Sequence, residues 1–118
     1  MELPSSNNVY GLLSCDGRLQ ELAQLLRALL AATESEISIK ISQFDGAQTL
    51  RVRTERAEFD AYLSGADRTF LFNGAVAGTA EQVCLFVQRL HKALQVAGFH
   101  PRLEVYDDDE KCIAAFDA

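Results

Sequence analysis

The chain has 118 residues, of which 48% are hydrophobic and 24% are charged. This is the composition of an ordinary soluble globular domain, and such a length holds a core without disulfides or metals, so one domain over residues 1–118 is expected. The net charge of −6 argues against nucleic acid and anionic membrane surfaces as partners, because both need a cationic protein surface. No apolar stretch approaches the roughly 20 residues that span a bilayer and no leader is recognisable, so a cytoplasmic location is expected.

The first half of the chain predicts a strand, a helix and a hairpin, in that order. Residues 9–13 form the strand, and a leucine-rich stripe with three- and four-residue spacing predicts a helix from an N-cap at Asp16 to about Thr33. Isoleucine, leucine and valine then alternate with polar residues over residues 37–53, around a turn at Asp45-Gly46. This alternation predicts a half-buried β-hairpin with one wet face.

The middle of the chain predicts a connection followed by a central strand. Residues 55–67 carry aromatic and aliphatic side chains at helical spacing, which indicates a short connecting helix or ordered loop. Residues 69–72 are apolar on both sides and are expected in the centre of a sheet. Asn73-Gly74 and Gly78 are then expected to break the chain.

The last third predicts a second helix and a second hairpin. Thr79 and Gln82 have the spacing of a capping box, and an apolar stripe continues from there to a stop signal at Gly98. Alternating residues over 102–116 predict a hairpin whose turn is the acidic run Asp107-Asp108-Asp109-Glu110.

These elements occur twice in the same order, over residues 9–54 and 69–116. We therefore expect an α+β fold of two βαββ-like halves, which form one mostly antiparallel sheet of about six strands with both helices on one face. Identity between the halves is slight, so convergence on a common layout explains the repeat almost as well as duplication.

Negative charge is concentrated in residues 104–110, where five acidic groups and no base account for −5 of the net charge of −6. Like charges this close favour a cationic neighbour. A solvated turn explains the run equally simply, because Asp is a common turn residue. A calcium site is disfavoured because the run lacks the spacing of a calcium loop.

The polar face of the expected sheet is a second candidate surface, since tyrosine and arginine are enriched at protein-binding hot spots. Exposure to solvent on one side is also ordinary for an antiparallel sheet. The candidate partner-binding residues are Glu104, Tyr106, Asp107, Asp108, Asp109, Glu110, Arg51 and Arg53.

No catalytic, cofactor or metal site is expected. Cys15, Cys84 and Cys112 are widely spaced and lack a C-x-x-C motif, which favours reduced, buried thiols. His91 and His100 stand in no metal-ligand spacing and are expected to be packing or loop residues. Residues 73–79 join a strand to a helix but match no phosphate-binding motif.

The chain resembles bacterial immunity proteins in its small acidic single domain and in its last third, Leu103-Glu104-Val105-Tyr106-Asp107-Asp108-Asp109-Glu110. Immunity proteins neutralise a cognate toxin of an interbacterial secretion system, such as type VI secretion. The resemblance implies a cytoplasmic, non-catalytic protein that binds a basic toxin domain and occludes its active site.

Two other functions stay open from the sequence. One is a small enzyme or ligand-binding domain with a cleft between the two halves, near Cys84 or His91. The other is a homo-oligomeric module, such as a homodimer, because an exposed strand edge can pair with a second copy.

Overall fold

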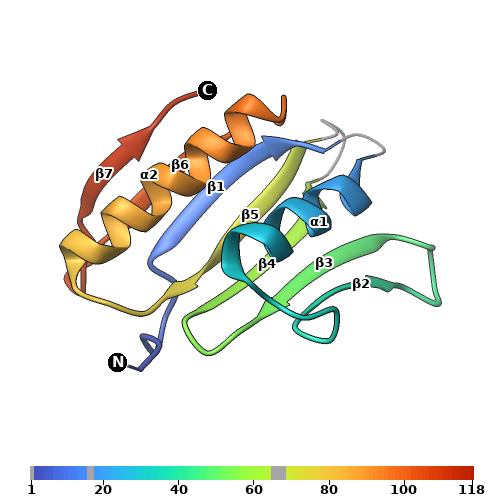
Figure 1. Ribbon diagram of the computed structural model, residues 1–118, viewed down its shortest axis with the longest axis horizontal. Coiled ribbons are helices and arrows are strands. Elements are labelled where there is room, and N and C mark those ends of the chain that lie inside the picture. The colour runs from blue at the N-terminus through green and yellow to red at the C-terminus, as the bar shows by residue number, and fades with distance from the viewer. Residues whose placement is uncertain (1, 16–17, 65–68) are drawn as a thin grey trace.

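A computed structural model describes residues 2–15, 18–64 and 69–118. It shows an α+β fold in which all neighbouring strands are antiparallel and both helices lie on one face of a single sheet (Figure 1). The elements in chain order are β1 (Val9–Ser14), α1 (Leu19–Leu30), β2 (Ile37–Ile41), β3 (Gln48–Arg53), β4 (Ala57–Ser64), β5 (Thr69–Val76), α2 (Ala80–Val96), β6 (Arg102–Tyr106) and β7 (Cys112–Phe116).

The strand order across the sheet is β2-β3-β4-β5-β1-β6-β7, so the two halves of the chain interlock. Helix α1 carries the chain from β1 near the centre to the edge strand β2, and α2 carries it from β5 past β1 to β6 (Figure 1). Strand β1 therefore lies between β5 and β6 of the other half. The sheet has seven strands rather than about six, because an additional strand, β4, joins the halves.

Strand β4 corrects the expected helix or loop over residues 55–67. Ala57, Phe59 and Ala61 are buried in the core, while Glu58, Asp60 and Tyr62 point the opposite way. The same side chains fit a period of two as well as a helical spacing, and hydrogen bonding to β3 on one side and β5 on the other selects the strand. Residues 65–67 lie outside the described residues.

Strand β5 runs through Asn73 and Gly74, where a chain break was expected. The aromatic ring of Phe59 occupies the space over Gly74, so that a Cβ there would lie 2.5 Å from Cδ1 of the ring. The Asn73 side chain accepts a 3.3 Å hydrogen bond from the Gly11 N–H of β1. These residues therefore serve close strand packing instead of a turn.

The second helix begins and ends as predicted, and the first differs at its ends. Thr79 and Gln82 form the capping box of α2, and Gly98 follows the helix with φ +85°. Helix α1 begins after Arg18, whose side chain makes no capping hydrogen bond. It ends before Ala31, which has φ 51°, rather than at Thr33. Asp16, the expected N-cap, lies outside the described residues.

The core lies between the helices and one face of the sheet. Leu22 and Leu26 of α1 and Leu90 and Leu94 of α2 are almost completely buried against it. Neither of the described helices is long enough and apolar enough to cross a membrane. Because both helices cover the same face, no helix of the described residues lies on the opposite face of the sheet (Figure 1).

Candidate functional site

The face of the sheet opposite the helices is the candidate site, and we call it the open face. Alternation along each strand sends every second side chain to it. With strands about 4.8 Å apart and about 17–25 Å long, its plan area is about 500–700 Å², close to the roughly 800 Å² per partner of a stable protein interface. Its main side chains are Tyr10, Leu12, Ser38, Lys40, Thr49, Arg51, Arg53, Glu58, Asp60, Tyr62, Leu71, Asn73, Ala75, Arg102, Glu104 and Tyr106.

A row of apolar side chains crosses the middle of the open face. Tyr62 of β4 is opposite Leu71 of β5, which is opposite Leu12 of β1, which is opposite Arg102 of β6. Tyr62 is 39% exposed and Leu12 38% exposed, so these side chains lie partly open to solvent. Arg102 ends the row with a guanidinium group. A partly exposed aromatic and aliphatic patch beside an arginine has the composition of an interface centre.

A pair of tyrosines stands beside this row. The rings of Tyr10 and Tyr106 meet edge to face, with 5.3 Å between centroids and a 90° angle between planes. The Tyr106 hydroxyl donates to Glu104 Oε1 at 3.4 Å. Loss of hydration, and then the negative charge of Glu104, raise the pKa of the Tyr106 phenol above its usual value. The Tyr106 phenol therefore stays protonated at neutral pH and is a hydrogen-bonding group of the open face.

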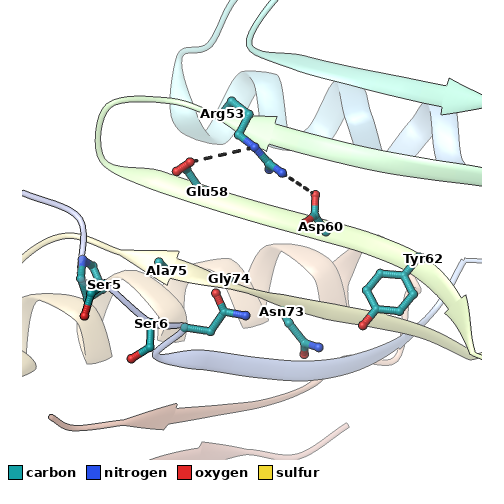
Figure 2. A pocket seen from close by; sticks show the side chains of 11 residues that line it. Ser5, Ser6, Arg53, Glu58, Asp60, Tyr62, Asn73, Gly74 and Ala75 are labelled. Atoms are coloured by element: carbon teal, nitrogen blue, oxygen red, sulfur yellow. Dashed lines mark hydrogen bonds and ion pairs between the residues drawn. The ribbon is translucent and has the colours of Figure 1, made fainter.

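On the other half of the open face, arginines are paired with carboxylates of the same chain, and Figure 2 shows Arg53 between Glu58 and Asp60. Arg53 Nη2 lies 2.9 Å from Asp60 Oδ1, and Arg53 Nε lies 4.0 Å from Glu58. Arg51 Nε approaches Asp60 at 3.7 Å. Arg53 also donates to the main-chain oxygens of Val52 and Phe59. The charge of β3 and β4 is thus balanced within the molecule.

A polar pocket of about 300 Å³ lies over β4 and β5, with residues 4–7 of the N-terminal segment along one side (Figure 2). Arg53 lines it, but its guanidinium is already paired with Glu58 and Asp60. An anionic ligand would have to compete with both carboxylates for this cation. The pocket is therefore poorly suited to anions.

The acidic turn, which we define as residues 107–110, joins β6 to β7 where the open face ends at Tyr106. The Asp107 carboxylate accepts 2.9 Å hydrogen bonds from the N–H groups of Asp109 and Lys111, so it shapes the turn. Asp108, Asp109 and Glu110 are exposed. Within residues 2–15, 18–64 and 69–118, no lysine or arginine forms an ion pair with this turn.

The structure brings together only part of the residue set expected from the sequence. Glu104 and Tyr106 lie on β6 directly before the acidic turn, whereas Arg51 and Arg53 lie on β3, separated from β6 by three strands. Sequence reasoning missed the residues between them. The alternating burial of β1 places Tyr10 and Leu12 on the open face. The missed open-face residues are Tyr10, Leu12, Tyr62 and Leu71.

The histidine and cysteine side chains differ in their relation to the open face, where the Cys112 Sγ lies 4.0 Å from Glu104 Oε2. His91 is buried, and its Nε2–H donates to the Pro101 carbonyl oxygen at 3.0 Å. Neither His91 nor half-buried Cys84 lines the pockets of the open face. Cys112 is exposed on β7, so the expectation of three buried thiols was wrong for it. Across the part of the chain that is described, no three potential metal ligands form a group that could hold an ion.

No protein-family model, curated protein or solved structure matches this chain.

Proposed function

We propose that this chain is a non-catalytic binding protein that docks a basic protein on the open face, with the acidic turn guiding association. The observation that carries the proposal is an imbalance of charge. The arginines of β3 are paired with Asp60 and Glu58, whereas the carboxylates of Asp108, Asp109 and Glu110 have no cationic partner among the described residues. The free negative potential therefore collects at one end of the face.

Unpaired carboxylates on an exposed turn act mainly on the rate of encounter. Complementary fields raise association rates by about ten- to a thousandfold at low ionic strength, and salt suppresses the effect because the Debye length is about 8 Å at 0.15 M. A partner with clustered lysine or arginine side chains would gain from this field. The acidic turn then sets how fast the complex forms.

Residence time would come from the apolar row and the tyrosine pair, because they supply desolvated contact area. Tyr10, Leu12 and Tyr62 are each between a third and a half exposed, so a partner can bury them further. Truncation of an anchor at an interface centre typically costs 2 kcal/mol or more of binding free energy, about thirtyfold in affinity. These residues are expected to set the dissociation rate.

In its most specific form, the proposal makes this chain an immunity protein. The partner would be a basic toxin domain of an interbacterial secretion system, whose active site is occluded by the open face. The paired arginines Arg51 and Arg53 would hold the β3–β4 part of the face in a fixed shape and add planar contact surface.

The test uses a toxin domain encoded beside the gene for this chain, with association and dissociation rates measured at low and high salt. In the variant Asp108→Asn/Asp109→Asn/Glu110→Gln, Asp107 stays to hold the turn. We expect its association rate to fall about tenfold at low salt and to approach the wild-type rate at high salt. Tyr62→Ala is expected to raise the dissociation rate at least tenfold.

The matched control is Glu34→Gln/Glu55→Gln/Glu81→Gln, which removes the same charge from exposed residues outside the open face. Its association rate should change much less than that of the turn variant. An equal effect in both variants, or no effect in either, would show that the turn has no directing role. Absence of any complex with the wild-type chain would reject the immunity function.

A further inference from the structure

Three strongly exposed apolar side chains lie at two separate places on the surface. Phe44, in the turn that joins β2 to β3, is fully exposed, and Ile41 at the end of β2 is 64% exposed. Leu85 of α2 is 54% exposed, and it lines a groove between the two helices. Exposed apolar side chains that gather in this way mark contact sites for other proteins. The turn and the groove are the two places described next.

The β2–β3 turn, which we define as residues 42–47, lies at an outer corner of the molecule (Figure 1) and is held by its own hydrogen bonds. The Phe44 N–H donates to Ser42 Oγ at 3.2 Å, and the Ala47 N–H donates to Asp45 Oδ1 at 2.9 Å. The Gly46 N–H donates to the Ser42 carbonyl oxygen at 3.0 Å. Phe44 is therefore presented from an ordered turn, so that little conformational entropy is lost when another molecule buries it.

A groove of about 720 Å³ lies between the end of α1 and the beginning of α2. The opposite ends of the helices are joined, because Arg18, directly before α1, donates to the carbonyl oxygen of Ala97, directly after α2, at 2.7 Å. The apolar side chains that line the groove are Leu29, Leu30, Ala57, Val76, Ala77, Leu85 and Phe86. The groove thus offers an apolar lining to an inserted side chain.

Two arginines at the rim of the groove are available to a carboxylate. Arg56 and Arg89 line the groove, and neither forms an ion pair with another residue that the structure describes. The rim also carries two acids, of which Glu36 accepts hydrogen bonds from the N–H and hydroxyl of Thr33 at 3.0 Å, while Glu55 is exposed. A ligand that joins an apolar group to a carboxylate therefore suits this groove.

The β2–β3 turn carries both of these groups. Asp45 directly follows Phe44, and the hydrogen bond from the Ala47 N–H is the main cause that lowers the pKa of the Asp45 carboxyl, so it is ionised at neutral pH. Phe44 cannot fill the groove of its own molecule, however. Strand β2 begins directly after Glu36 at the groove and carries the chain away from it for four residues, about 13 Å at about 3.3 Å per residue, before the turn begins.

We propose that the β2–β3 turn of one copy of this chain inserts Phe44 into the groove between the helices of a second copy, with Asp45 facing Arg56 and Arg89. This single contact covers apolar side chains on both molecules, Phe44 and Ile41 on one and Leu85 on the other. Because the turn and the groove are different surfaces, the contact is head-to-tail, and each copy can bind two others. The contact is small and belongs to the weak, transient class. It leaves the open face accessible, because the groove lies on the helical side of the sheet.

Sedimentation equilibrium at up to about 1 mM protein tests the contact with this chain alone, so its outcome is independent of the proposed binding function. The average mass of the wild-type chain should rise with concentration beyond that of a dimer. Phe44→Ser and Leu85→Glu should each lower the association constant tenfold or more. The matched control is Val96→Glu, also on α2, where the side chain is 75% exposed and lies outside the groove, and it should leave association unchanged. Circular dichroism confirms that each variant is folded.

Mixing the two variants identifies the contact. Phe44→Ser keeps an intact groove and Leu85→Glu keeps an intact turn, so an equimolar mixture should form a one-to-one dimer and nothing larger. Asp45→Asn keeps the oxygen that accepts from Ala47 and should weaken association about two- to fivefold at low salt.

Three results would overturn the proposal. The first is a wild-type chain that stays monomeric at about 1 mM or that stops at a dimer. The second is association that survives Phe44→Ser, and the third is a mixture of the two variants that stays monomeric.

Discussion

Substitution of Gly74 by alanine is expected to destabilise the fold strongly, although alanine is the smallest change a glycine accepts. A Cβ at this position would lie 2.1 Å from the Glu58 carbonyl oxygen and 2.5 Å from Cδ1 of Phe59, where ordinary contacts begin at 3.4 Å. The Phe59 ring is also stacked on Phe72, with 4.6 Å between centroids. A side chain and a main-chain segment of β4 must therefore both move.

Forcing one extra methyl into a packed core costs about 1–3 kcal/mol when side chains alone adjust. Because a main-chain oxygen is the closest atom here, we expect a cost at the upper end, about 3 kcal/mol. A chain of this size has a free energy of unfolding of about 6–18 kcal/mol. With an m-value of about 1.5 kcal/mol per molar urea, the unfolding midpoint should fall by about 2 M.

Gly46→Ala is the control, because it makes the same chemical change where nothing lies within 4 Å of the added Cβ. Gly46 has φ +74°, so this variant should lose only about 1 kcal/mol from left-handed backbone strain. Phe59→Leu combined with Gly74→Ala relieves the ring contact but leaves the carbonyl contact, and should stay destabilised. Equal midpoints for wild type and Gly74→Ala would refute the close packing of β4 on β5.

Three further predictions concern stability and reactivity. Ala31→Gly should raise the free energy of unfolding by about 0.5–1 kcal/mol in urea titrations, because Ala31 follows α1 with φ 51° and glycine adopts this conformation without strain. An unchanged urea midpoint would contradict this prediction. Arg27→Met should lower the free energy of unfolding by about 2 kcal/mol, because the Ile37 carbonyl loses a charged hydrogen-bond donor. A change near zero would show that water replaces the guanidinium. Burial raises the pKa of the Cys15 thiol from 9.0 to about 11, and the charge of Arg18 partly opposes this shift. As the pH rises, the thiol therefore ionises in the unfolded chain before it ionises in the folded chain, so the free energy of unfolding should fall between about pH 9 and pH 11. This slope should be smaller in Cys15→Ala, and at pH 8 a thiol reagent should label exposed Cys112 in the native protein but reach Cys15 only after unfolding.

The open face shows how charge and shape divide between the two halves of the sheet. Paired arginines and carboxylates order β3 and β4, while tyrosines, leucines and the acidic turn lie over β1, β5 and β6.

Local patterns were sufficient for the elements whose signals lie close together in the sequence. The capping box of Thr79 and Gln82 and the stop at Gly98 determine α2 through contacts within one helical turn. The two hairpins follow from period-two alternation around short turns, and the acidic run at 107–110 is visible directly. Each of these features is decided by residues a few positions apart.

Tertiary structure alone decided the remaining features. Residues 57–64 fit a helix or a strand locally, and only pairing with β3 and β5 makes them β4. Gly74 is typical of a turn, and only the Glu58 carbonyl oxygen and the Phe59 ring, sixteen and fifteen positions earlier, require glycine within a strand. The neighbours of β1 and the arrangement of the open face depend on pairing between residues 55 or more positions apart, which no local pattern encodes.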